Sequence, residues 1–294
     1  MAVIAPAGST ELDVAAAQRW MRERGFRLKL YPGVLEKTGY LAGSDTVRLR
    51  DFHDAFADPE VDGILCMRGG YGSPRLLDRI DFDLLRKHPK PFIGYSDLTA
   101  IHLAIARECG YVTFHGPMLT GDLLKGRQAP TEASLLDLIG GRLRAGARFP
   151  HPAAHPLVAV EHGISRGRLM GGNLSMICSL MGTPWEMASD GIILFIEDVN
   201  EPLYRIDRLL NQLRLAGKLN GLRGVLAGDF AGVDREPLDA LLHQFFGPLG
   251  IPVLSGWRSG HCDPNLTLPL GAIVTLDAER KALFLEQDAV TGPA

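Results

Sequence analysis

Three polar residues follow apolar runs of the sequence and have the types that nucleophilic catalysis needs. Ser96 follows PFIGY, Glu197 ends the run GIILFIE, and His261 comes a few residues after IPVLSG. A serine nucleophile needs a base, and the base needs an acid that fixes its tautomer and stabilises the imidazolium. Ligands collect beyond the carboxyl ends of strands in open parallel sheets, so convergence of these three ends would serve this chemistry.

Each of these residues also has a simpler interpretation. Ser96 could be only the N-cap of the helix that follows it, and Asp198 or Asn200 could cap the next helix without any catalytic role. A lone loop histidine such as His261 is more often a surface residue than a catalyst. The sequence GYSDL around Ser96 lacks the second glycine of G-x-S-x-G, so an ordinary α/β-hydrolase elbow is not indicated.

A glycine-rich turn, MRGGYGS, follows the buried run GILCM. Its glycines, Gly69, Gly70 and Gly72, let the backbone approach a ligand closely and turn N–H groups inward, as an oxyanion hole or a phosphate nest requires. The spacing matches neither G-x-G-x-x-G nor the P-loop, so a nucleotide site is only weakly indicated. A tight strand-to-helix turn explains the glycines equally well.

These candidate residues are positioned by alternating strands and helices in the first half of the chain. Strands are predicted at Val3 to Ala5, 26–31, 63–67, 91–95 and 111–115. Helices are predicted up to Gly25 after a cap at Ser9 or Thr10, and up to Phe56 after a cap at Ser44. A third begins with Ser73 as cap and Pro74 as the first helical residue, and a fourth covers 97–108. Such alternation predicts a parallel sheet covered by helices on both faces.

The chain changes character between residues 126 and 162, where Pro and Ala gather without clear periodicity around a short helical piece. We interpret 126–162 as a linker between a domain over 1–125, which carries the serine, and one over 163–294, which carries Glu197 and His261. Further strands are predicted over 191–197, 223–228, 251–255 and 272–276, with an amphipathic helix over 201–215. Two α/β domains are therefore expected.

The composition narrows the function classes. The 294 residues are 46% hydrophobic and carry a net charge of −3 with scattered cations, so nucleic acid is an unlikely partner. No apolar stretch is long enough to span a membrane, and no signal peptide is evident, so we expect a cytoplasmic protein. The four cysteines are far apart and no histidine pair has metal-binding spacing, so neither a metal nor a cofactor is expected.

The motifs in this order resemble the LD-carboxypeptidase family of serine peptidases, which includes murein tetrapeptide carboxypeptidases and microcin C self-immunity peptidases. The matching segments are IAPAGS, YLAGSD, MRGGYGSPRLLDRID, IGYSDLTAIHLA, FHGPM, GGNLSMICSLMGTPWE, LFIEDVNEPLYRIDRLLNQL and GHCDPNLTLPLGA. They run over nearly the whole chain. The resemblance overturns the simpler interpretations of the three residues above.

The resemblance implies Ser96 as nucleophile, His261 as general base and acid, and Glu197 as the orienting carboxylate. It implies an oxyanion hole made by the backbone N–H groups of Gly70 and Asp97. It also implies a flavodoxin-like, parallel-sheet N-terminal domain, a smaller α/β C-terminal domain, and a homodimer.

The family's activities differ in substrate. We favour release of D-alanine from the L-to-D bond of murein tetrapeptides in cell-wall recycling, with a muropeptide or other small peptide as substrate. Arg68, Tyr71 and Trp185, which lie in matched segments, are expected to contact it. The alternatives are hydrolysis of an amide in an aminoacyl nucleotide, and a non-catalytic two-lobed protein that closes on a small ligand.

Overall fold

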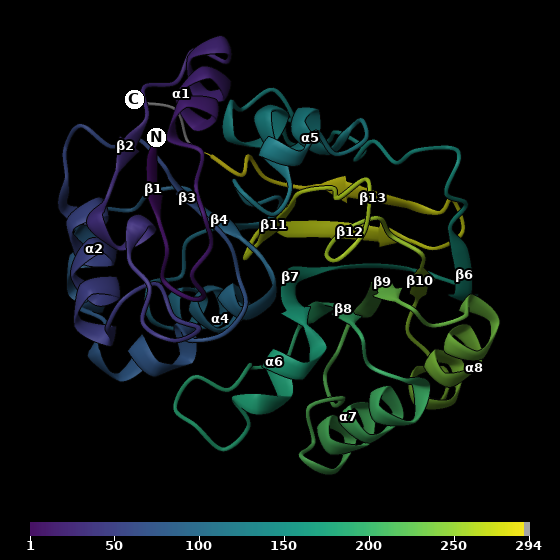
Figure 1. The fold of residues 1–294 in the computed structure, drawn as a ribbon. Helices are drawn as coiled ribbons and strands as arrows, with labels where there is room; N and C mark the ends of the chain where they lie inside the picture. The colour runs from purple at the N-terminus through teal and green to yellow at the C-terminus, as the bar shows by residue number, and fades with distance from the viewer. Residues whose placement is uncertain (291–294) are drawn as a thin grey trace.

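The structure, a computed structural model, describes residues 1–290 and contains two β-sheets that stand side by side (Figure 1). The first has six strands in the order β11-β5-β4-β3-β1-β2. They are β1 (Ala2–Ile4), β2 (Lys29–Leu30), β3 (Ile64–Cys66), β4 (Phe92–Gly94), β5 (Thr113–His115) and β11 (Leu268–Leu270). Strands β1 to β5 pair in parallel in the flavodoxin-like order 2-1-3-4-5, which confirms the fold expected for this half.

Helices lie between these parallel strands, and one short helix follows the last of them. The α-helices are α1 (Val14–Glu23), α2 (Asp45–Ala57), α3 (Phe82–Lys87) and α4 (Thr99–Glu108). The short 3₁₀ helices are η1 (Pro32–Leu35), η2 (Ser73–Arg79), η3 (Ser96–Leu98) and η4 (Leu123–Lys125). Ser44 caps α2 as predicted, because its side chain accepts a hydrogen bond from the Val47 N–H.

The predicted start of the first helix is wrong. Asp13, not Ser9 or Thr10, is the N-cap of α1, and its carboxylate accepts a hydrogen bond from the Ala16 N–H. Ser9 lies before the helix, where its N–H donates a hydrogen bond to the carbonyl of Tyr40. Ser73 is likewise the first residue of η2 rather than its cap, which is Gly72.

The second sheet has seven strands in the order β13-β12-β7-β8-β9-β10-β6. They are β6 (Val158–Glu161), β7 (Ile164–Asn173), β8 (Ile192–Val199), β9 (Gly224–Ala231), β10 (Val253–Ser255), β12 (Ile273–Asp277) and β13 (Ala282–Leu285). Strands β7 to β10 are parallel, and the other pairs are antiparallel. The helices of this half are α6 (Leu174–Ser179), α7 (Leu203–Leu215), α8 (Arg235–Phe246) and η5 (Gly247–Leu249).

The two halves are joined by helix packing and by a strand from the second half that pairs with the first sheet. Helix α4 packs against β7 and α6, and the N–H of Asn173 donates to the Thr99 hydroxyl at 3.0 Å. Strand β11 comes from the second half of the chain but pairs antiparallel with β5 of the first sheet. The end of β4 and the end of β8 are thereby held beside each other.

The predicted linker contains regular structure. It includes α5 (Thr131–Ile139) and β6, which pairs with β10 in the second sheet. The hydroxyl of Thr131 accepts a hydrogen bond from the Asn265 N–H, which fastens α5 to the second half of the chain. The division at residues 125 and 163 stays a prediction, and the last four residues of the predicted second domain lie outside the described residues.

Candidate active site

Ser96 lies in a sharp turn directly after β4. Its backbone φ is +65°, a left-handed conformation that few residues with a side chain adopt. The helical segments η3 and α4 begin at this turn. Gly69 packs directly against it, since a Cβ on Gly69 would lie 3.0 Å from the Cβ of Ser96. The glycine-rich turn after β3 is therefore in contact with the serine.

The structure brings Ser96, Glu197 and His261 together from β4, β8 and the loop after β10. Nε2 of His261 lies 3.1 Å from Oγ of Ser96, and Nδ1 lies 2.7 Å from Oε2 of Glu197. The ionised carboxylate can only accept, so Nδ1 carries the hydrogen and Nε2 is free to accept one from the serine hydroxyl. This arrangement suits a serine, a base and an orienting acid.

Glu197 reaches this position because β8 is irregular there. The pairing of β8 with β9 shifts register between Ile196 and Asp198, and such bulges redirect a side chain. Close approach to the histidine loop also depends on Gly260, whose φ is +102°. A Cβ at Gly260 would lie 2.3 Å from Oε2 of Glu197, so a side chain there would displace the carboxylate.

Glu197 and His261 shift each other's pKa values in the direction that favours their charged forms. Burial alone would raise the pKa of the fully buried Glu197, but the facing His115 and His261 outweigh burial and lower this pKa to about 2. Burial would lower the pKa of His261, yet the carboxylate of Glu197 raises it above its ordinary value. Glu197 is therefore ionised at neutral pH and favours the imidazolium form of His261.

Asp198, the neighbouring acid, has different partners. Its carboxylate accepts hydrogen bonds from the N–H and hydroxyl of Ser175 at 2.9 and 2.7 Å. It also accepts one from the side-chain amide of Asn173, which caps α6. Asp198 therefore holds the start of α6, whereas Glu197 faces His261.

The predicted oxyanion donors lie on two turns that are clamped together. The Ser73 N–H donates to Oδ2 of Asp97 at 2.8 Å, and the Ser73 hydroxyl donates to the Asp97 carbonyl at 2.6 Å. Within residues 1–290, the N–H groups of Gly70 and Asp97 donate to no protein acceptor. Both are thus available to a ligand beside Ser96, and their role as an oxyanion hole stays a prediction.

A pocket of about 520 Å³ opens beside the glycine turn. Two of the predicted substrate residues line it, Arg68 and Tyr71, and sequence reasoning missed two others, Lys37 and Tyr40. The rings of Tyr40 and Tyr71 lie 5.7 Å apart, centre to centre. Among residues 1–290, neither Arg68 nor Lys37 has a carboxylate partner within ion-pair distance. Arg68 donates a hydrogen bond to the Ser9 carbonyl.

Trp185, the third predicted substrate residue, follows α6 and packs against the buried core. It does not line the pocket beside Gly70. Its contact with substrate stays a prediction.

Sequence reasoning also missed His115, which faces Glu197 from the side opposite His261. Its Nε2 lies 3.9 Å from Oε1 of Glu197, and both side chains are fully buried. The available signal was its place at the end of the apolar run YVTFH, in line with Ser96 at the end of PFIGY.

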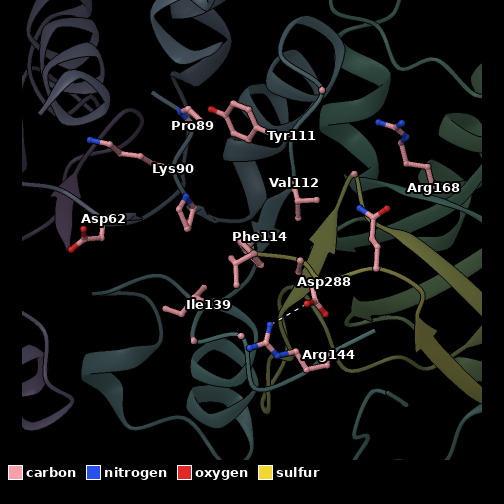
Figure 2. A pocket seen from close by; sticks show the side chains of 18 of the residues that line it. Asp62, Pro89, Lys90, Tyr111, Val112, Phe114, Ile139, Arg144, Arg168 and Asp288 are labelled. Carbon is pink, nitrogen blue, oxygen red and sulfur yellow. Dashed lines mark hydrogen bonds and ion pairs between the residues drawn. The ribbon is translucent and has the colours of Figure 1, made fainter. Parts of the chain in front are cut away.

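A larger pocket of about 810 Å³ lies at the opposite end of the first sheet (Figure 2). Asp62, Lys90 and Tyr111 line it, and they precede β3, β4 and β5 respectively. Ser96 follows β4, so this pocket is separate from the candidate site. Figure 2 also shows the ion pair between Arg144 and Asp288 in its wall.

In the part of the chain that the structure describes, no helix has the length and apolar character needed to cross a membrane. The same residues contain no group of three or more His, Cys, Asp or Glu side chains placed to hold a metal ion.

Comparisons with known proteins identify the family to which the sequence is similar. The sequence signature of the LD-carboxypeptidase N-terminal domain matches residues 1–116, and that of the C-terminal domain matches residues 166–276. A probable murein peptide carboxypeptidase of Bacillus subtilis is 40% identical over 99% of this chain and 92% of its own length.

Two solved structures have the same fold. Muramoyltetrapeptide carboxypeptidase from Oxalobacter formigenes matches with a TM-score of 0.80 and 30% identity over 96% of each chain. The structure of MccF in complex with glutamyl sulfamoyl guanosine matches with a TM-score of 0.87 and 25% identity, over 99% of this chain and 96% of that one. These matches confirm a two-domain α/β serine peptidase and set aside the non-catalytic alternative. The chain belongs to the LD-carboxypeptidase family.

Proposed function

We propose that this protein removes the terminal D-alanine from murein tetrapeptides by hydrolysing the L-to-D amide bond. The Ser96 hydroxyl attacks the carbonyl carbon while Nε2 of His261 takes its proton. The N–H groups of Gly70 and Asp97 stabilise the oxyanion of the tetrahedral intermediate. His261 then gives the proton to the leaving amine of D-alanine, and a water molecule releases the peptide from Ser96 by the same steps.

The observation that carries this proposal is the cationic pocket beside Gly70. An exopeptidase must recognise a free terminal carboxylate next to the bond that it cuts. Arg68 and Lys37 are cations without acidic partners among residues 1–290, and the pocket that they line contains no acidic side chain. A guanidinium binds a carboxylate through two parallel hydrogen bonds, so we assign Arg68 as its main partner.

The matched test uses a tetrapeptide that ends in D-alanine and the same peptide ending in D-alaninamide. Loss of one charged hydrogen-bond partner costs about 1.5–3 kcal/mol, so Arg68→Ala should lower kcat/KM for the acid roughly 10- to 150-fold. The wild type should prefer the acid over the amide, and the variant should lose this preference. Arg19→Ala, an exposed cation on α1, serves as the control. Equal rates on both peptides in the wild type would contradict the proposal.

A second candidate function is hydrolysis of an aminoacyl nucleotide amide. The paired rings of Tyr40 and Tyr71 at the wall of the pocket favour it, because aromatic rings stack on a base while Lys37 and Arg68 attract phosphate. Parallel assays with the tetrapeptide and an aminoacyl sulfamoyl adenosine distinguish the two, and we expect faster cleavage of the tetrapeptide.

The cellular role follows from the substrate. With the cytoplasmic location expected from the sequence, we propose a recycling step that acts on imported muropeptides. We further propose a homodimer, as the family resemblance implies. Sedimentation of the purified protein tests the dimer independently of activity.

A further inference from the structure

Glu197 lies between the buried His115 and the partly exposed His261. Its Oε2 accepts hydrogen bonds from Nδ1 and the backbone N–H of His261 at 2.7 and 3.1 Å. On the other side, Oε1 accepts one from the Asn173 amide at 3.3 Å and lies 3.9 Å from Nε2 of His115. Glu197 and His115 are both 0% exposed.

His115 is held so that its Nε2 faces the carboxylate. The Ser259 hydroxyl lies 3.4 Å from Nδ1, and the rings of Phe195 and Tyr95 pack against the imidazole. Among the described residues Nε2 has no hydrogen-bond partner, and the polar group that it faces is Oε1 of Glu197. A buried polar nitrogen is costly without a partner, so this orientation needs the carboxylate.

The tautomer follows from the neighbours. An ionised carboxylate only accepts, so the nitrogen that faces it must carry hydrogen. The Ser259 hydroxyl can donate to Nδ1, which gives the second ring nitrogen a partner. The titratable groups that face His115 are Glu197, Tyr95 and His102, and His102 is itself bonded to Gly94 and Thr113.

We propose that His115 is a positioning residue for the reaction, which directs its Nε2–H at Oε1 and thereby keeps Oε2 of Glu197 aimed at His261. The inference rests on the proposed catalytic roles of Ser96, Glu197 and His261. Its effect on the rate is indirect, because His115 touches the orienting carboxylate and not the reacting atoms. Groups that orient the ligands of a metal ion from behind typically contribute about 10- to 100-fold to activity, and we expect an effect of the same order here.

Two substitutions separate the effect of the Nε2–H group that faces Oε1 of Glu197 from the effect of packing. Gln keeps an N–H donor on a side chain of similar reach, whereas Phe fits the aromatic surroundings and has no donor. We expect His115→Phe to lower kcat for D-alanine release roughly 10- to 100-fold with KM changed less than about twofold, and His115→Gln to restore most of the loss. His102→Gln is the control for a buried histidine off the triad, and it should lower the melting temperature without this loss of kcat.

The possible outcomes distinguish failure of the role of His115 from failure of the proposed function. If Ser96→Ala is inactive while His115→Phe has wild-type kcat, or if Gln rescues no better than Phe, the role of His115 is refuted. If Ser96→Ala stays active, the proposed function itself fails. A ¹⁵N NMR spectrum of the histidines in the wild type needs neither substrate nor variant. It should show hydrogen on Nε2 of His115, and a ring protonated only on Nδ1 would overturn the inference.

Discussion

Replacing Glu197 by Gln keeps the shape of the side chain but removes its charge. The carboxylate meets donors on both sides, with His261 at Oε2 and Asn173 and His115 on the side of Oε1. A glutamine amide has one oxygen, so either orientation turns its NH₂ group toward a donor. The substitution therefore removes the charge that stabilises the imidazolium and sets two donors against each other in a buried site.

These losses predict that kcat falls roughly 10²- to 10⁴-fold, which corresponds to about 3–5.5 kcal/mol of transition-state stabilisation. The assay is the initial rate of D-alanine release from one tetrapeptide, with folding verified by thermal unfolding. Asp198→Asn is the matched control, because Asp198 binds the start of α6 instead of His261. It should lower stability with a much smaller loss of kcat. A larger loss of kcat for Asp198→Asn than for Glu197→Gln would refute our assignment of the carboxylate.

Three further predictions concern neighbouring groups. Ser73→Ala loosens the clamp on Asp97 and should lower kcat by about tenfold, as steady-state kinetics would show; an unchanged kcat would contradict the clamp. Gly260→Ala should lower both kcat and stability, because its Cβ would meet Glu197, whereas Gly25→Ala, with φ of +79° and open space around it, should cost stability alone. Because the pKa of Glu197 is lowered to about 2, its charge stabilises the fold above pH 4.5 and this contribution is lost as the pH falls toward 2. The stability advantage of the wild type over Glu197→Gln in denaturant titrations should therefore shrink by about 3 kcal/mol over that range, and a constant difference would count against the buried ion pair.

The sequence predicts the strands that end near the candidate site, because each is a short apolar run with a polar residue after it. The regular alternation of strands and helices also predicts the parallel sheet of the first half, whose flavodoxin-like order is implied by the family resemblance. The helical periodicity predicts an apolar face of α7 made by Leu203, Ile206, Leu210 and Leu213. The last three are buried, and Leu203 is partly buried.

Other features depend on contacts between distant parts of the chain. Strand β11 was not predicted, since Pro269 lies within it and argues against a strand, and its pairing with β5 at the sheet edge is set by the packing of the two halves. The register shift beside Glu197 leaves no pattern in the sequence, although it redirects the side chain. His115 resembles any core histidine until the fold brings it to Glu197.

In the proposed reaction, Ser96 attacks the amide bond before a terminal D-alanine. The most direct measurement is the amount of D-alanine released from a defined tetrapeptide by the wild type and by Ser96→Ala at equal concentrations of folded protein. The wild type should release D-alanine, and the variant should be slower by on the order of 10⁴-fold or more. Absence of release by the wild type, or more than about a tenth of its rate in the variant, would contradict this proposal.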